Sequence, residues 1–117
     1  MRIDPNPTFT GPVKLTVPGE QELAQINVTW RHKGRDQLKE WAARPLLATA
    51  AGIVPLEVEA EYLAEVIESW DGPRDPAGGK VAFSTQALGR LLQSYPAAGE
   101  ELYRQYLRAM TESRLKN

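Results

Sequence analysis

The chain has 117 residues, of which 42% are hydrophobic and 25% are charged, and these values are ordinary for a folded globular domain. A formal net charge of -1 argues against a protein built mainly to neutralise nucleic-acid phosphates, and the lack of cysteine excludes disulfides, thiolate nucleophiles and cysteine-based zinc sites. No apolar run approaches the roughly 20 residues that a membrane-spanning helix needs. We therefore expect one soluble domain with one hydrophobic core, which stays in the cell that makes it.

The first part of the chain predicts a flexible leader followed by a β-hairpin. Residues 1–8 are rich in proline and polar side chains, a composition typical of a poorly packed segment, and we expect a single domain over residues 9–117. Within residues 13–17 and 24–30, apolar side chains alternate with polar ones. This period of two predicts an antiparallel hairpin over residues 13–31 with one buried face.

Helical patterns follow the hairpin. The stretch "RDQLKEWAARPLLATAAG" has apolar residues at helical spacing and predicts a first helix, which Pro45 should end or kink at Arg44. After Pro55, an apolar stripe at helical spacing extends as far as Trp70 and predicts a second helix. We expect the apolar face of the hairpin to pack on the part of this helix from Tyr62 to Trp70.

Two further helices are predicted near the C-terminus. Phe83 and Leu88 flank Ser84 as a hydrophobic staple around an N-cap, so a helix should run from Thr85 to about Tyr95. A last helix ends in the basic stretch "RLKN", which suits the negative end of the helix dipole. The predicted fold is therefore α+β, with an N-terminal antiparallel β-hairpin packed on three to four α-helices.

The last helix carries the surface on which we predict a protein partner to bind. Its apolar side chains form two adjacent rows, a stripe wider than one terminal helix needs to dock on its own domain. Tyrosine offers a large contact area and methionine repacks easily against an irregular helical partner. The alternative is that the whole stripe is buried in the core of the chain itself. The predicted partner-binding residues are Leu102, Tyr103, Arg104, Tyr106, Leu107, Arg108 and Met110.

The acidic, glycine-rich stretch "DGPRDPAGGK" is a candidate calcium or phosphate loop. Taken as an EF-hand loop from Asp71, it has Pro73 at the third position and Ala82 at the twelfth, where oxygen ligands are needed. A phosphate-binding loop would need a glycine at Arg74 and a hydroxyl residue at Val81. Both interpretations fail, so we predict a connector between two helices.

No residue pattern predicts catalysis, a cofactor or a metal. His32, the only histidine, is not part of a Ser-His-Asp pattern with a glycine elbow, and we interpret it as a residue at the end of a strand. Four glutamates at helical spacing could hold a metal on one helix face, but without histidine or a second acidic helix a solvated acidic face is favoured. These glutamates are Glu57, Glu61, Glu65 and Glu68.

Charge is segregated along the chain. Basic residues concentrate between Arg31 and Arg44, whereas acidic residues dominate from Glu57 to Asp75. Opposite patches suit self-association or docking to a charged partner, and an ordinary charged surface is the alternative. Because a two-stranded hairpin also leaves unpaired edges, we predict a homo-oligomer in which strand edges pair or the basic segment of one copy faces the acidic face of another.

Four stretches of the chain occur in a recognisable order. They are "VTWRHKGRDQLKEW" after the hairpin, "LAEVIESWDG" before the glycine-rich loop, "VAFSTQALGRLLQSYP", and a final helix ending in "SRLKN". This combination, which covers roughly residues 9–117, resembles the phage tail assembly chaperones of long-tailed bacteriophages. The stretch "WDG" with the loop behind it looks like a landmark of that family.

The resemblance implies a non-enzymatic protein that binds the long helical tape measure protein, keeps it soluble and helps to recruit tail tube subunits. It also implies activity in the cytoplasm of the infected host cell and absence from the mature virion. It offers no catalytic residues to carry over, and we expect neither a cofactor nor a membrane partner.

Two other functions remain as alternatives. The segment "TQALGRLLQSYPAAGEELYRQYLR" has two predicted helices around a tight break, loosely like the helix-turn-helix of a small nucleic-acid-binding regulator. Glu100 and Glu101 at the start of the second helix would meet phosphates with the wrong sign, so nucleic acid is not the expected partner. The other alternative is a structural protein of the virion, such as a tail completion protein.

Overall fold

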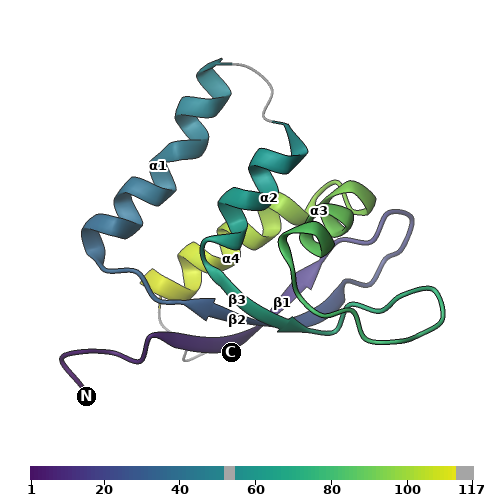
Figure 1. The fold of residues 1–117 in the computed structure, drawn as a ribbon, viewed down its shortest axis with the longest axis horizontal. Coiled ribbons are helices and arrows are strands. Elements are labelled where there is room, and N and C mark those ends of the chain that lie inside the picture. Colours follow the sequence, from purple (N-terminus) through teal and green to yellow (C-terminus); the bar gives the residue numbers. More distant parts are fainter. Residues whose placement is uncertain (52–54, 113–117) are drawn as a thin grey trace.

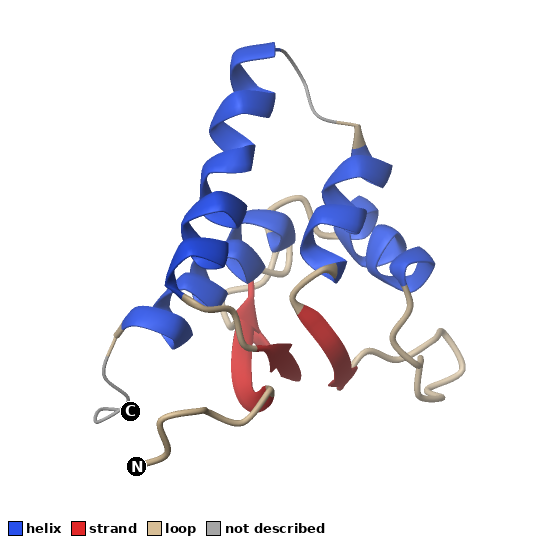
Figure 2. Cartoon of the chain, turned by 60° about the vertical axis from the view of Figure 1, so that its left-hand side comes forward, coloured by secondary structure: helices blue, strands red, loops and turns tan. Residues whose placement is uncertain are grey.

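A computed structural model of the chain describes residues 1–51 and 55–112. These residues form a three-stranded antiparallel sheet and four helices, and the helices gather on one side of the sheet (Figure 1, Figure 2). The expected α+β fold is confirmed. Residues 1–7 precede the first strand and are exposed. The flexibility of the leader and the division into leader and domain stay predictions.

The first two strands form the predicted antiparallel hairpin. They are β1 (Thr8–Leu15) and β2 (Ala24–Arg31), and both bury alternate side chains on one face. β1 begins before Val13, where the alternation starts, because Gly11 and Pro12 interrupt the apolar pattern without interrupting the pairing. Pro12 is tolerated since β1 is an edge strand, where one side of the backbone needs no partner.

The chain enters the sheet a third time where a helix was expected. The prediction of a helix as far as Trp70 is wrong, because α2 (Leu56–Ala64) is shorter and β3 (Ile67–Asp71) pairs antiparallel with β2. The apolar stripe could not distinguish a helix from a strand here, because Val66 and Ile67, both fully buried, fit helical and strand periodicity alike. Pairing with β3 also occupies an edge of β2 that a hairpin alone would leave open. Trp70 is therefore a half-buried strand residue.

The first helix continues through its proline. α1 (Arg35–Ala51) does not end at Arg44, so the expectation that Pro45 ends the helix there is wrong, and the alternative of a kink stays a prediction. Pro45 lacks the N–H that would bond the carbonyl four residues earlier, which belongs to Trp41. The Trp41 carbonyl instead accepts a hydrogen bond from the Tyr62 hydroxyl of α2 at 2.5 Å. A tertiary contact thus replaces the bond that the proline removes.

The two C-terminal helices match the prediction. α3 (Thr85–Ser94) begins after Ser84, whose Oγ accepts a hydrogen bond from the backbone N–H of Ala87 at 3.0 Å. α4 (Ala98–Thr111) follows after a short break. The basic residues 114–117, predicted to end the last helix, lie outside the described residues.

The hydrophobic core fills the space between the sheet and the helices. The helix that lies against β1 is α4, whereas the hairpin was expected to pack on the second helix. Thr16, just after β1, donates its backbone N–H to the Glu101 carboxylate of α4 at 3.0 Å. Among the described residues, the apolar side chains with an exposure of 1% or less are Val13, Val28, Trp30, Trp41, Leu63, Val66, Ile67, Leu88, Ala98, Leu102 and Tyr106.

Candidate partner-binding surface

The predicted partner-binding residues all lie on α4, but burial separates them. Leu102 and Tyr106 are fully buried members of the core. Tyr103, Leu107 and Met110 are only partly buried and pack at the margin of the core. We call these three residues the outer row. The stripe is thus neither wholly buried nor wholly exposed, and its outer row is the part that a partner can reach.

The two arginines of the predicted surface are exposed on α4. Nη2 of Arg104 lies 2.5 Å from a carboxylate oxygen of Glu100, one turn earlier on the helix. Arg108 lies one turn beyond Arg104. Exposed ion pairs of this kind contribute little to stability, so they can exchange for contacts with a partner at small cost. The binding role of the arginines and of the outer row stays a prediction.

An aromatic cluster ties α1 to α2, α4 and the sheet. The fully buried ring of Trp41 stacks on the rings of Tyr62 and Tyr103, with centroids 4.4 and 5.4 Å apart. The ring of Tyr106 meets Trp41 edge-on at 5.1 Å and lies 5.2 Å from Trp30 of β2. Trp30 and Trp41 are therefore core residues. Tyr103 belongs both to this aromatic cluster and to the outer row, so the outer row is continuous with the cluster.

The tyrosines of α4 use their hydroxyl groups to hold backbone carbonyls. Tyr103 donates a hydrogen bond to the Ala42 carbonyl of α1 at 2.9 Å, and Tyr106 donates to the Arg31 carbonyl at 2.6 Å. Burial raises the pKa of Tyr106 to about 12. Because both hydroxyl groups already donate hydrogen bonds within the chain, a partner would contact Tyr103 through its ring.

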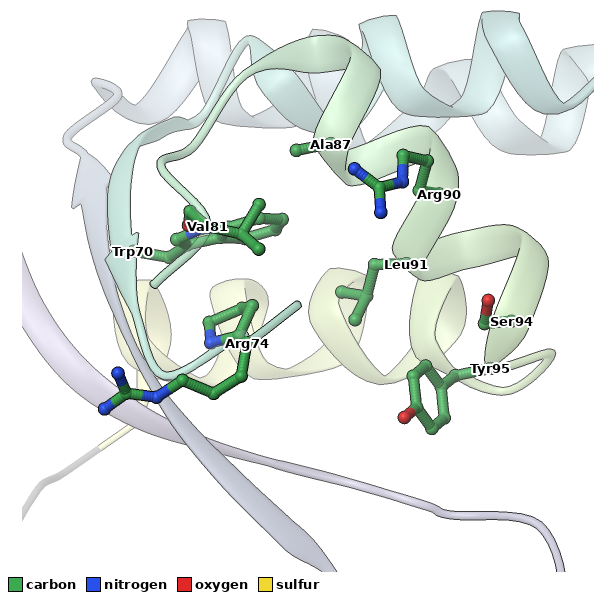
Figure 3. Close-up of a pocket in the computed structure, with 9 residues that line it drawn as sticks. Trp70, Arg74, Val81, Ala87, Arg90, Leu91, Ser94 and Tyr95 are labelled. Atoms are coloured by element: carbon green, nitrogen blue, oxygen red, sulfur yellow. Dashed lines mark hydrogen bonds between the residues drawn. The ribbon is translucent and has the colours of Figure 1, made fainter. Parts of the chain in front are cut away.

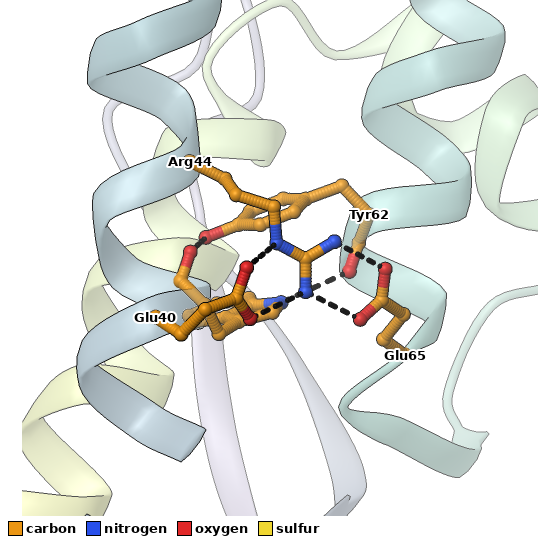
Figure 4. A network of polar contacts seen from close by, with 5 residues as sticks. Glu40, Arg44, Tyr62 and Glu65 are labelled. Atoms are coloured by element: carbon orange, nitrogen blue, oxygen red, sulfur yellow. Dashed lines mark hydrogen bonds and ion pairs between the residues drawn. The ribbon is translucent and has the colours of Figure 1, made fainter. Parts of the chain in front are cut away.

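Arg44 joins α1 to α2 through a polar network (Figure 4). Its Nη1 and Nη2 atoms donate hydrogen bonds to the Glu65 carboxylate at 2.8 and 2.7 Å, and its Nε lies 3.1 Å from Oε2 of Glu40. The guanidinium carbon also lies 5.4 Å from the centre of the Tyr62 ring. The hydrogen bond from Arg44 lowers the pKa of Glu65, and the same bond is the main cause of a raised pKa of Arg44.

Ion pairs inside the chain join the basic segment to the acidic segment. Arg31 at the end of β2 donates a hydrogen bond to the carboxylate of Glu68 in β3 at 2.7 Å, and Arg44 donates one to the carboxylate of Glu65. These four side chains come from the segments that were predicted to face each other between copies. Their partners lie within one chain, and a homo-oligomer stays a prediction.

The residues considered for catalysis or metal binding are dispersed. His32 directly follows β2, is exposed, and donates its backbone N–H to the Pro7 carbonyl. Of the four glutamates expected on one helix face, Glu68 lies on β3 and Glu65 follows the end of α2. Within the part of the chain that the structure describes, no group of histidine, aspartate and glutamate could hold a metal ion.

The stretch "DGPRDPAGGK" connects a strand to a helix, and not two helices as predicted. Asp75 shapes it, because Oδ1 accepts hydrogen bonds from the backbone N–H groups of Ala77 at 3.0 Å and Gly79 at 2.8 Å. Such bonds from aspartate to its own backbone are typical turn chemistry.

An open pocket lies between this loop and α3 (Figure 3). Its volume is about 180 Å³. The pocket combines side chains of β3, of the loop and of α3, so no local sequence pattern could have predicted it. The residues that matter most for its chemistry are Trp70, Arg74, Val81, Arg90, Leu91 and Tyr95.

Comparison with known proteins identifies the family. A family model described as phage tail assembly chaperone matches residues 1–117. No curated protein and no solved structure matches the chain. In the described ranges, none of the helices has the length and apolar character that crossing a membrane requires.

Proposed function

Because the chain belongs to the phage tail assembly chaperone family, we propose that it binds the tape measure protein, keeps this client soluble and helps to recruit tail tube subunits. The family match over the whole chain is the observation that carries the proposal. On this proposal the chain acts in the host cell cytoplasm, without catalysis, as a homo-oligomer, and is absent from the mature virion.

The outer row of α4 is the proposed client-binding surface. Tyr103, Leu107 and Met110 follow one another at spacings of four and three residues, so they form a strip along α4 that suits a client helix. The ring of Tyr103 is already held by its stacking on Trp41, and a side chain ordered in advance loses little entropy when a partner binds. Arg104 and Arg108 flank the strip and can meet carboxylates of the client.

The contacts of α4 do not favour the nucleic-acid alternative. Glu101, at the start of this helix, accepts hydrogen bonds from the backbone N–H and the hydroxyl of Thr16. Arg104 pairs with Glu100. A recognition helix would present the opposite charge at this end.

Co-expression with the tape measure protein tests the proposed function. We expect the client to be soluble only when this chain is present, and to co-purify with it. A client that aggregates equally with and without the chain would contradict the proposal. Mass spectrometry of purified virions tests the expected absence from the particle, and a stoichiometric amount there would favour the structural alternative.

A pair of variants tests the binding surface separately. Leu107→Ser together with Met110→Ser should abolish co-purification of the client while the chain still folds, because both side chains are only partly buried. The matched control is Val58→Ser on α2, which replaces an apolar side chain that is 49% exposed and does not belong to α4, and it should leave the client bound. If the α4 variant folds and still holds the client, the surface is wrong although the function can stand.

A further inference from the structure

The pocket between the loop and α3 has an apolar floor that is already in place. The indole Nε1 of Trp70 donates a hydrogen bond to the Val81 carbonyl at 2.7 Å, and the Trp70 ring meets Phe83 edge-on with centroids 5.1 Å apart. Leu91 of α3 and the half-buried ring of Tyr95 complete the apolar lining. A floor fixed in this way needs little reordering when a ligand enters, which favours binding.

Two arginines stand at the rim of this pocket. Figure 3 shows Arg90 reaching over the pocket from α3, while Arg74 extends outward from the loop. Both are exposed, and neither has an ion-pair partner among residues 1–51 and 55–112. Arg90 therefore differs from Arg31, Arg44 and Arg104, which each hold a glutamate.

The acidic groups near this rim are already engaged. α3 has no aspartate or glutamate in its sequence. In the loop, the Asp75 carboxylate accepts two backbone N–H groups, and the Asp71 carboxylate lies 4.0 Å from Nζ of Lys80. The rim therefore carries two arginines without an ion-pair partner among the described residues, and the nearby Asp75 carboxylate is held in place by backbone N–H groups of its own loop.

The size of the pocket indicates what it can hold. A cavity of about 150 Å³ accommodates benzene, whereas sites for small-molecule ligands usually measure about 300 to 1,000 Å³. At about 180 Å³ this pocket fits one large apolar side chain and is too small for a cofactor.

We propose that this pocket is a second docking site, which receives one apolar side chain of a protein partner whose neighbouring residues carry carboxylates. The apolar side chain packs against Trp70 and Leu91, and the carboxylates pair with Arg90 and Arg74. Arginine is suited to this role because its planar guanidinium binds a carboxylate through two parallel hydrogen bonds. None of the lining residues lies on α4, so this site and the outer row can bind different segments at the same time.

A protein segment fits this site better than a nucleic acid. Single-stranded nucleic acid is bound in a basic groove that follows several phosphates, with aromatic rings exposed for base stacking. Here the positive charge comes from two arginines beside a pocket, and one edge of the Trp70 ring is held by its bond to Val81.

Nuclear magnetic resonance on the full chain tests the proposal with two synthetic peptides. In one peptide a leucine is flanked on both sides by glutamates, and in the matched peptide lysines replace the glutamates. The indole N–H resonance of Trp70, assigned by its loss in Trp70→Phe, reports on the pocket directly. We expect the glutamate peptide to shift this resonance at concentrations up to about 1 mM, less so at high salt, and the lysine peptide to leave it unchanged.

Charge reversal separates the arginines from general electrostatics. Arg74→Glu combined with Arg90→Glu should weaken binding of the glutamate peptide at least about tenfold and should create binding of the lysine peptide. Arg35→Glu changes an exposed arginine at the start of α1 and is the matched control, which should alter neither affinity. If the double variant does not fold, Arg90→Gln takes its place with the same expected loss of the glutamate peptide.

Several results would overturn the proposal. They are an unmoved Trp70 resonance up to about 1 mM glutamate peptide, equal binding of both peptides, or an equal loss of binding in Arg35→Glu. A single-stranded oligonucleotide that shifts the resonance at lower concentration than the glutamate peptide would assign the pocket to nucleic acid instead. The pocket and the client-binding surface can be tested independently, because the client test concerns α4. A pocket variant that loses the glutamate peptide but still co-purifies with the client would show that the pocket is a site distinct from the one in the proposed function.

Discussion

Trp41 and Tyr62 hold α1 and α2 together through two hydrogen bonds that run in opposite directions. The Trp41 indole donates to the Tyr62 carbonyl at 3.2 Å, and the Tyr62 hydroxyl donates to the Trp41 carbonyl at 2.5 Å. Their rings stack between these bonds, with planes 5° apart. The Trp41 carbonyl is also the one that Pro45 leaves without a donor in the helix, so Tyr62 satisfies a backbone group that would otherwise be buried and unpaired.

Tyr62→Phe should therefore lower the free energy of unfolding by about 1 to 3 kcal/mol, the usual cost of leaving a buried acceptor unsatisfied. Pro45→Ala restores a backbone N–H that can bond the Trp41 carbonyl, so the same tyrosine change should cost clearly less in that background. Urea unfolding of the four proteins in this cycle measures the difference. An identical cost in both backgrounds would show that the hydroxyl does not compensate for the proline.

The two tyrosines of α4 should differ in what they contribute to folding. Tyr106→Ser should cost about 3 to 5 kcal/mol, because the ring is fully buried against Trp30 and Trp41. Tyr103→Ser should cost less, since its ring is only partly buried. Thermal unfolding followed by circular dichroism compares the two variants. Equal losses would mean that the ring of Tyr103 is as much a part of the core as that of Tyr106.

Glu59→Gln should stabilise the protein at neutral pH. Glu59 of α2 packs over Gly99 of α4, and burial raises the pKa of its carboxyl group. A pKa that is higher in the folded state than in the unfolded chain means that protonation favours the fold, and this contribution is lost as pH rises through the folded-state value. The gain in melting temperature should thus be present at pH 7 and vanish below about pH 4. Glu57→Gln, which changes an exposed glutamate of the same helix, is the matched control.

Two glycine substitutions should change the free energy of unfolding in opposite directions. Gly72→Ala should cost about 1 to 3 kcal/mol, because Gly72 has a φ of +140° and a Cβ there would lie 2.8 Å from Cγ2 of Ile26. Gly89→Ala should instead raise the free energy of unfolding by about 1 kcal/mol, since it lies inside α3 with nothing within 4 Å of its added Cβ. Chemical denaturation of both variants checks the pair. Stabilisation by the change at Gly72 would contradict the close approach to Ile26.

Where neighbours along the chain determine structure, the sequence alone was sufficient. The alternation of the first two strands, the Ser84 cap and the amphipathic pattern of α4 are local signals, and each predicted its element. The family resemblance also depended only on the order of short stretches, and the match over residues 1–117 confirms it. Local signals carry this information because a helix cap and an apolar periodicity involve residues that lie only a few positions apart.

Only the tertiary structure decided the features that depend on distant partners. Val66 and Ile67 join the sheet because β2 offers an open edge, and α1 passes through Pro45 because Tyr62 supplies the missing donor. Two further features follow from which segments meet in space: Tyr106 is buried beside the partly buried Tyr103, and Arg74 and Arg90 lie at the pocket without an ion-pair partner among the described residues. A short apolar run fits a helix or a strand equally well by itself, and its environment in the fold selects between them.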